Sequence, residues 1–424
     1  MWWLTLPVIV YSAGLLVLWV MLVRRSDSKG PGDGGMTEAG DITGADDVRA
    51  LPKISVVVAA KNEEKSLPAL LESLSLQDYP PDLLEIIIVN DNSADRTPVL
   101  VSEFIESRRD PAVPGMKLIY NPFSGKKRAV RYGIEKASGE VIVTTDADCI
   151  VGPGWARSHA EWYCTGHSVQ HGEAEGSRAG VTAAVHHLQY SHAGSDCPDM
   201  VLAPVVQRPV RGFWSYFGVF EFSALQALTE ATVLAGKPVM CNAANMSFRR
   251  DVYMRHAGEL RTDLPSGDDM FLLEAVMRDG GAVRHDGRRA AAAETAGAVT
   301  AAALLRQRAR WASKAFHLRG APTLTLAAAT AACNAAAAAA AVAAIISVKF
   351  LPVAATLYAI KTIPDCLLIA GEMRKRGNHL KTLPFITAEI IYPFYFMVVA
   401  AMSRFQSARQ FRERLGFSFP PPKP

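Results

Sequence analysis

The chain has 424 residues, and its 45 Lys and Arg against 41 Asp and Glu leave a formal net charge of only +4. This weak charge gives no reason to expect a nucleic-acid partner, and the 50% apolar content excludes an intrinsically disordered chain. Six cysteines without a C-x-x-C pair argue against a disulfide scaffold and a standard zinc ribbon.

The first expected element is a transmembrane anchor over residues 1–25. Residues 2–23 are almost entirely apolar, and about 20 such residues cross a bilayer as a helix. No Lys or Arg precedes this run and no A-x-A site follows it, which favours an anchor over a cleaved signal peptide. Arg24 and Arg25 place the next segment in the cytoplasm by the positive-inside rule. Residues 26–50 are rich in Gly and Asp and are expected to form a linker.

From Lys53 onward the pattern predicts strands that alternate with helices. Four apolar strands are expected at 54–58, 85–89, 117–120 and 141–143, with helices near 67–74, 95–109 and 126–137. This alternation predicts an α/β domain with a mostly parallel sheet, whose ligands bind at the carboxyl ends of the strands. The polar residues at those ends are Lys61-Asn62-Glu63, Asp91-Asn92-Ser93 and Asp146-Ala147-Asp148.

Residues 154–200 break this pattern and contain several cysteines and histidines. Cys164, His167 and His171 have a spacing that could hold a metal ion. We favour a polar surface insertion, because no second close pair completes the ligand set.

The C-terminal region, 319–403, is expected to contain two or three membrane helices. The candidates are 324–348, 350–371 and 384–403. Alanine is a good helix former but only weakly lipophilic, so the alanine-rich first candidate is a weakly hydrophobic transmembrane helix. The second candidate carries Lys361 and Asp365, which could pair at their i, i+4 spacing.

Two basic segments, the connection 372–383 and the tail 404–424, bear on the topology. Three full C-terminal spans would put the tail outside the cytoplasm, whereas two would keep both basic segments inside. We therefore expect two full spans, with 384–403 lying in the interface or re-entering. Three ordinary spans are the alternative.

Asp146 and Asp148 directly follow the fourth predicted strand. Two carboxylates that alternate at a strand end can bind one hard divalent cation, with substrate phosphates completing its shell. A D-x-D triplet alone is a weak signal, and a polar turn is the alternative interpretation.

Six motifs occur in a characteristic order along the chain. They are Val58–Glu64, Val89–Asp95, Gly125-Lys126-Lys127, Thr145–Asp148, Gly267-Asp268-Asp269 and Gln307–Trp311. Together they resemble family 2 glycosyltransferases, the membrane-bound group that includes cellulose, chitin and hyaluronan synthases. The resemblance covers about residues 51–318 and implies a GT-A fold, a nucleotide-sugar-binding α/β domain flanked here by transmembrane helices.

The resemblance implies a site for a nucleotide-sugar donor. Glu63 and Asp91 match positions that hold the uracil and ribose of a UDP-type donor. Lys126 or Lys127 would neutralise the donor diphosphate, the alternative being a solvated helix start.

A metal ion and a catalytic base are implied as well. Asp148, with Asp146 beside it, matches the residue that holds a divalent cation, Mg²⁺ or Mn²⁺. Asp269 matches the last acid of the family's T-E-D or G-D-D motif and would take the proton from the acceptor hydroxyl, giving inversion. Asp268, beside it in the motif, is the second catalytic candidate. The alternative is that Asp268 and Asp269 only cap an apolar helix over 270–277.

The remaining motifs are implied to bind the diphosphate and the acceptor. Arg308 and Arg310 would supply positive charge to the diphosphate, and Trp311 a flat face for a sugar ring. The implied acceptor-binding residues are Asn242, Asn245, Gln307 and Trp311, the asparagines lying in a segment that looks like the acceptor-side loop of bacterial members. An amphipathic helix at the membrane surface is the alternative for 307–311.

The function implied is that of an inverting glycosyltransferase in a bacterial inner membrane, with its catalytic domain in the cytoplasm. Its partners would be a nucleotide-sugar donor, a lipid-linked or saccharide acceptor, and membrane lipids. A synthase that extrudes a polymer needs enough membrane helices to form a channel. Two or three weakly hydrophobic C-terminal helices are few for that, which favours transfer to such an acceptor.

Two other functions remain open. A nucleotidyltransferase of similar fold is disfavoured by the motifs at 267–269 and 307–311. A non-catalytic membrane component of a polysaccharide complex is disfavoured by the intact Asp146, Asp148 and Asp269. One departure from the family pattern is Asn90-Asp91 in place of the commoner paired aspartates.

Overall fold

The computed structural model describes residues 2–28, 51–108, 113–164, 197–208, 211–261, 264, 267–313 and 317–414. The chain forms two compact units, each assembled from separate stretches of sequence. The α/β unit comprises Arg24–Val206 and Thr229–Thr295. The helical unit comprises Met1–Val23, Gln207–Leu228 and Ala296–Pro424.

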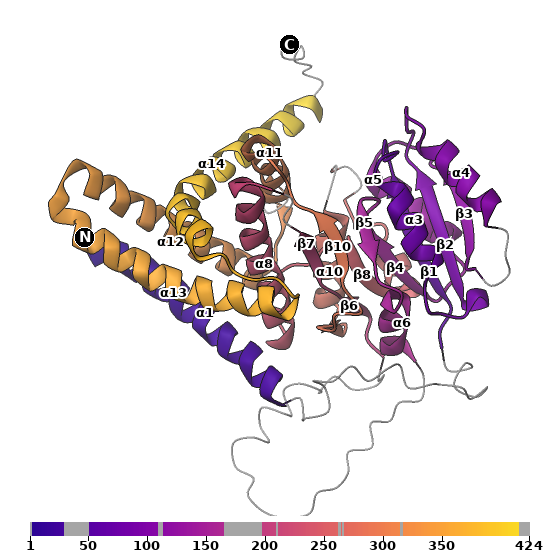
Figure 1. The fold of residues 1–424 in the computed structure, drawn as a ribbon, viewed down its shortest axis with the longest axis horizontal. Helices are drawn as coiled ribbons and strands as arrows, with labels where there is room; N and C mark the ends of the chain where they lie inside the picture. Colours follow the sequence, from indigo (N-terminus) through magenta and orange to yellow (C-terminus); the bar gives the residue numbers. More distant parts are fainter. Residues whose placement is uncertain are drawn as a thin grey trace, which may run out of the picture. The chain divides into compact units, whose positions relative to one another are not determined.

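The α/β unit is built on a seven-stranded sheet of order β3-β2-β1-β4-β8-β6-β9 (Figure 1). These strands are β1 (Ile54–Ala60), β2 (Leu84–Asn90), β3 (Gly115–Tyr120), β4 (Val141–Thr145), β6 (Met200–Leu202), β8 (Asn245–Arg249) and β9 (Val283–His285). The first four are parallel to one another, and β8 runs antiparallel to both β4 and β6. A smaller sheet has the order β5-β10-β7, with β5 (Cys149–Val151), β7 (Val205–Arg208) and β10 (Ala293–Ala296).

Short helices connect these strands. They are α3 (Leu67–Ser75), η1 (Pro81–Leu83), α4 (Thr97–Ser107), α5 (Lys126–Lys136), α6 (Trp155–Ala160), η2 (Glu161–Tyr163), α9 (Arg250–His256) and α10 (Asp268–Arg278). Helix α3 buries the leucine stripe read from the sequence, and α5 packs against β1 and β2. The predicted alternation is thus confirmed, and the continuous apolar runs of β1 and β2 reflect burial on both faces of a parallel sheet.

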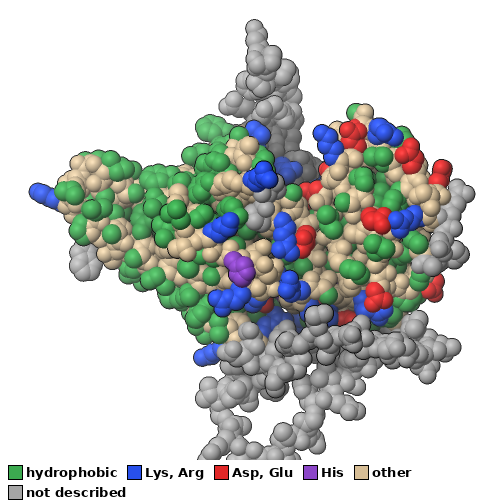
Figure 2. Space-filling view, in the orientation of Figure 1, with side chains coloured by type: hydrophobic (Ala, Val, Ile, Leu, Met, Phe, Trp, Pro, Cys, Tyr) green, Lys and Arg blue, Asp and Glu red, His purple; other side chains and the backbone are tan. Residues whose placement is uncertain are grey.

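The helical unit contains four described helices that are long and apolar enough to cross a membrane. They are α1 (Trp2–Ser28), α12 (Ala321–Ile346), α13 (Leu351–Lys375), preceded by the turn η4 (Val348–Phe350), and α14 (Thr382–Arg414). The surface over these helices is largely hydrophobic and carries few charged side chains on the face drawn in Figure 2. Length and composition alone therefore allow three C-terminal spans as well as the two that we expected.

Two further helices complete the helical unit, α11 (Ala301–Ala312) and the first part of α8 (Phe213–Leu234). Phe217 and Phe220 of α8 pack with Leu304 of α11 and with Phe385 and Tyr395 of α14. The first part of α8 and the whole of α11 belong to the helical unit because they bury their apolar faces against the C-terminal helices. The domain limits of 51–318 stay a prediction.

Candidate functional site

The carboxyl ends of β1, β2 and β4 meet at one edge of the parallel sheet, as parallel strands must. Hydrogen bonds join the loop after β1 to the loop after β2. Asn62, at a φ of 57°, donates through its backbone N–H to Ser93 Oγ (3.1 Å) and accepts from Ala94 N–H (2.8 Å). The Glu63 N–H donates to Thr97 Oγ1 (2.8 Å), which fixes this glutamate beside the second loop.

Asp91 is buried at the end of β2 and organises the start of α5. Its Oδ1 accepts from Asn121 Nδ2 (2.8 Å) and from Gly125 N–H (2.9 Å). Gly125 has a φ of 106°, a conformation that favours glycine, and it directly precedes α5. Asp91 therefore holds the turn that presents Lys126.

Lys126 lies at the centre of a cluster of acids. Its Nζ is 2.5 Å from Asp146 Oδ1. Desolvation by itself lowers its pKa, but Asp146, and more weakly Asp268 and Asp148, raise that pKa above the ordinary lysine value. Lys126, Thr145, Asp146 and Asp268 line one pocket with apolar residues of β1, β8 and α10. The structure thus brings three candidate site residues, Lys126, Asp146 and Asp268, into one pocket.

Asp146 and Asp148 are close enough to repel each other. Desolvation, followed by the Asp146 carboxylate, raises the pKa of Asp148, and Thr295 Oγ1 donates to Asp148 Oδ2 at 3.3 Å. Two facing carboxylates of like charge fit a divalent cation. No group of three or more His, Cys, Asp or Glu lies within ligating reach in the part of the chain that the structure describes. A cation here would therefore need ligands from a bound diphosphate or from water.

The two acids at the start of α10 have different surroundings. Asp268 lines the pocket with Lys126. Asp269 is buried, and its carboxylate accepts from Met270 N–H (2.8 Å) and Ala243 N–H (3.4 Å). Asp269 therefore lies against the loop that contains Asn242, whose own side chain accepts from Ala244 N–H (3.0 Å).

Lys127 does not reach the pocket, in contrast to its neighbour. It is buried, it donates to the carbonyls of Leu260 (3.2 Å) and Arg261 (3.0 Å), and it lies over the Phe271 ring. These contacts give Lys127 a structural role, and between the two lysines we keep Lys126 as the predicted contact of the diphosphate.

Asn245 also has structural partners only. Its amide nitrogen donates to the carbonyls of Pro204 and Ala291, both at 2.7 Å. Its amide oxygen accepts from Trp155 Nε1 (2.8 Å) and lies 3.0 Å from His159 Nε2. These contacts use the whole hydrogen-bonding capacity of the side chain. The expected contact of Asn245 with an acceptor stays a prediction, which would require one of these bonds to be exchanged.

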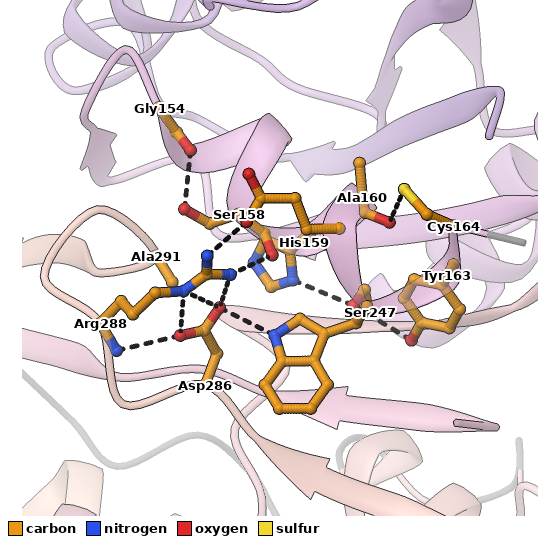
Figure 3. Close-up of polar contacts among 12 residues, drawn as sticks. Gly154, Ser158, His159, Ala160, Tyr163, Cys164, Ser247, Asp286, Arg288 and Ala291 are labelled. Carbon is orange, nitrogen blue, oxygen red and sulfur yellow. Dashed lines mark hydrogen bonds and ion pairs between the residues drawn. The ribbon is translucent and has the colours of Figure 1, made fainter. Parts of the chain in front are cut away.

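A polar network that includes His159, Ser247, Asp286 and Arg288 lies next to that asparagine, and Figure 3 shows these four residues. Burial, which outweighs the hydrogen bond to Asn245, lowers the pKa of His159 to about 4, so this imidazole is neutral at pH 7 and contacts Ser247 Oγ at 2.9 Å. Arg288 Nη2 donates to Asp286 (2.7 Å) and to the Ser158 carbonyl (2.8 Å). The network joins α6 to β8 and to the loop after β9, and no spacing in the sequence indicates it because its members are far apart in the chain.

The Gln307–Trp311 motif lies on α11 in the helical unit. Arg308 is buried, and its Nε is 2.7 Å from Glu221 Oε2 of α8. Its Nη1 donates to Gln307 Oε1 (2.8 Å), and its guanidinium carbon lies 4.2 Å from the centre of the Trp311 ring. Arg310 is exposed. Within the predicted Cys/His insertion, His167 and His171 lie outside the described residues.

The sequence was also compared with models of known protein families. Residues 55–253 match the model of Glycosyl transferase family 2. This part of the chain is therefore similar to the catalytic domain of family 2 glycosyltransferases. With its mostly parallel sheet, this domain has the GT-A fold.

Curated relatives share part of this domain. Over 107 residues it is 38% identical to the Probable glycosyltransferase YdaM of Bacillus subtilis, a match that covers 24% of each chain. Over 110 residues it is 31% identical to the Beta-monoglucosyldiacylglycerol synthase of Synechocystis, covering 26% of this chain and 22% of that protein. The match thus spans about a quarter of the length of these relatives.

One solved structure is similar over nearly the whole chain. The mannosyltransferase PcManGT from Pyrobaculum calidifontis, solved in complex with GDP-Man and Mn²⁺, has a TM-score of 0.53 at 20% identity. The similarity covers 95% of this chain and 99% of that one. At this identity the likeness shows a shared fold.

Proposed function

We propose that this chain is a membrane-anchored inverting glycosyltransferase, which moves a sugar from a nucleotide-sugar donor to a lipid-linked or saccharide acceptor. One observation carries the proposal. Lys126, Asp146, Asp148 and Asp268 gather at the carboxyl edge of a domain similar to that of family 2 glycosyltransferases. One fixed cation beside two repelling carboxylates suits a diphosphate bound together with a divalent metal ion.

The donor would bind over the loops after β1 and β2. Glu63 and Asp91 would accept hydrogen bonds from the base and the ribose, and Lys126 would contact the diphosphate. Asp146 and Asp148 would hold Mg²⁺ or Mn²⁺, which when bound neutralises charge on the departing nucleoside diphosphate. When the donor enters, Lys126 would exchange its contact with Asp146 for one with phosphate.

Asp269 would act as the general base. Its carboxylate lies against the loop of Asn242, the proposed acceptor side, whereas Asp268 lies at the donor pocket with Lys126. Asp269 would take the proton of the acceptor hydroxyl as its oxygen attacks the anomeric carbon. The new bond forms on the face opposite the leaving diphosphate, so the configuration inverts.

A membrane location supports a lipid-linked acceptor. Four candidate spans flank or follow the α/β unit, and Arg24 and Arg25 favour a cytoplasmic domain at a bacterial inner membrane. One relative is, by its name, a synthase of a glucosylated diacylglycerol. We propose a lipid carrier or membrane glycolipid as the acceptor.

A donor panel tests the proposal. Membranes containing the chain are incubated with UDP-, GDP- or dTDP-sugars and Mg²⁺ or Mn²⁺, and released nucleoside diphosphate is measured. We expect release with one donor class, its loss in EDTA, and its loss in Asp148→Asn. Asp78→Asn, which changes an exposed aspartate paired with Arg157, is the matched control and should retain activity.

Other outcomes would contradict the proposal. Release of pyrophosphate from a nucleoside triphosphate would indicate a nucleotidyltransferase instead. Binding of a donor without any turnover would indicate a non-catalytic component. Full activity in EDTA would remove the metal from the proposal.

A further inference from the structure

A buried carboxylate interrupts an aromatic stretch of α8. Residues 213–222 include six aromatic side chains and one acid, Glu221. Its side chain is only 10% exposed, and a carboxylate in such surroundings is unfavourable unless a partner compensates its charge. Arg308 of α11, 4% exposed, is that partner at 2.7 Å, and the Tyr395 hydroxyl of α14 donates to the same oxygen at 3.3 Å. Glu221 thus joins α8, α11 and α14.

The pair fixes the Arg308 guanidinium in one place. Nε is bound to Glu221 and Nη1 to Gln307, while Nη2 is buried without a hydrogen-bond partner among the described residues. A guanidinium held on two sides and removed from solvent is poorly placed to contact a donor diphosphate. Arg310, which is exposed on the same helix, is the better candidate for that contact.

The fixed guanidinium in turn covers the Trp311 ring. Its carbon lies 4.2 Å from the ring centre, the distance of a stacked cation–π contact. Phe222, the residue after Glu221, packs beside the same indole with ring centroids 6.1 Å apart. Adjacent residues of α8 therefore constrain Trp311 from two directions, one directly and one through Arg308.

We propose that Glu221 is a positioning residue for the acceptor platform: it orients Arg308, and Arg308 holds the Trp311 ring ready for an acceptor sugar. This inference rests on the proposed function only in assigning the acceptor to Trp311. It moves Arg308 from the expected diphosphate contact to the support of the indole. Loss of the Glu221 charge should therefore weaken acceptor binding and leave donor binding unchanged.

The experiment compares Glu221→Gln with a matched control. Glu372→Gln alters another buried glutamate of the helical unit, which lies near the end of α13 and pairs at 2.8 Å with Arg376, the residue that follows this helix. For Glu221→Gln we expect the acceptor KM to rise about 5- to 20-fold, as for the loss of one charge-assisted hydrogen bond, with the donor KM within about twofold of wild type. Glu372→Gln should leave both KM values within about twofold.

Two further measurements separate positioning from general stability. The double variant Glu221→Leu/Arg308→Met replaces the ion pair by apolar side chains, a change that often preserves folding. It should fold yet keep the raised acceptor KM. In protein labelled with 5-fluorotryptophan, the ¹⁹F resonance of Trp311, assigned with Trp311→Phe, should shift or broaden in Glu221→Gln and stay unchanged in Glu372→Gln.

The contrary results are distinct. An unchanged Trp311 resonance in Glu221→Gln, a raised donor KM, or a wild-type acceptor KM in the double variant would each overturn the positioning role. A wild-type protein that transfers no sugar from any donor would instead refute the proposed function. In that event the Trp311 resonance still decides whether Glu221 positions the ring.

Discussion

Asp268 and Asp269 are adjacent in the chain and yet face different surroundings, so their substitutions should have different effects. Asp269→Asn removes the proposed proton acceptor but keeps one side-chain oxygen, which can still accept from the Met270 N–H at the start of α10. We expect its transfer rate to fall about 10²–10⁴-fold, typical for a lost general base, with donor affinity near wild type. Asp268→Asn should weaken donor binding more than catalysis. Transfer rate and donor affinity are measured for both variants, and full activity in Asp269→Asn would exclude it as the base.

Glu85 supports the sheet through a charge that depends on pH. Burial raises its pKa, but Lys117, Ser55 and Ser138 donate to its carboxylate and together lower that pKa from the ordinary 4.5 to about 2. Because the folded-state pKa is the lower one, the stabilisation is complete above about pH 4.5 and is lost as the pH falls toward 2.

Glu85→Gln should therefore destabilise the protein at pH 7 by about 2 kcal/mol, and the difference from wild type should shrink below pH 4.5. Thermal unfolding of the full chain in detergent, repeated at several pH values between 2 and 7, measures the difference in stability between the variant and wild type. Glu72→Gln, which alters an exposed pair with Arg108, is the control and should change stability by less than about 1 kcal/mol. A gap that is constant with pH would contradict the assignment.

The sequence was sufficient to predict which loops carry the polar residues, but not which member of a pair faces the ligand. Lys126 and Lys127 are equivalent in a motif, and only the packing of α5 on β1 and β2 sends the second lysine to the Leu260 and Arg261 carbonyls. The four partners of Asn245 come from three distant segments: α6, the residue Pro204 and the residue Ala291. No local pattern could indicate them.

At the scale of elements, α13 and α14 are joined by charges buried within the helical unit. Lys361 Nζ lies 2.7 Å from Asp365 Oδ2 and 2.6 Å from Glu389 Oε2 of α14. The Tyr11 hydroxyl of α1 donates to Asp365 Oδ1 at 2.8 Å. The i, i+4 spacing predicted the Lys361–Asp365 pair. The contributions of Glu389 and Tyr11 depend on tertiary packing, which periodicity does not report.

Lys361→Met should destabilise this bundle strongly, because it leaves two buried carboxylates without a cation, a change that typically costs about 3–5 kcal/mol. The triple variant Lys361→Met/Asp365→Leu/Glu389→Leu should recover most of that loss. Lys349→Met, at an exposed position between α12 and α13, is the control for removal of a lysine. Thermal unfolding in detergent compares the three, and a triple variant as unstable as the single one would contradict the explanation.

At the scale of the whole molecule, the helices set a testable topology. In a variant without native cysteines, His379→Cys in the basic connection should resist an impermeant thiol reagent in intact cells, and Lys349→Cys at the opposite turn should react. Arg404→Cys tests α14. It should be protected if the tail stays inside, as expected from its basic residues, and reactive if α14 crosses fully. Ready labelling at His379→Cys would invert the proposed orientation.

Residues 207–228 belong to the helical unit and interrupt the α/β unit in the sequence. This interruption affects how the α/β unit can fold while the chain is being synthesised. Strand β8 lies in the sheet between β4 and β6, but it emerges from the ribosome only after the aromatic half of α8. Until β8 arrives, one side of β4 lacks its neighbour, while an apolar helix is already exposed. The sheet therefore cannot be completed before the translating ribosome has released a segment that belongs with the C-terminal helices, and those helices are made last. Trimming the ends of the chain would leave that segment uncovered, so a soluble catalytic fragment would require its surface to be redesigned.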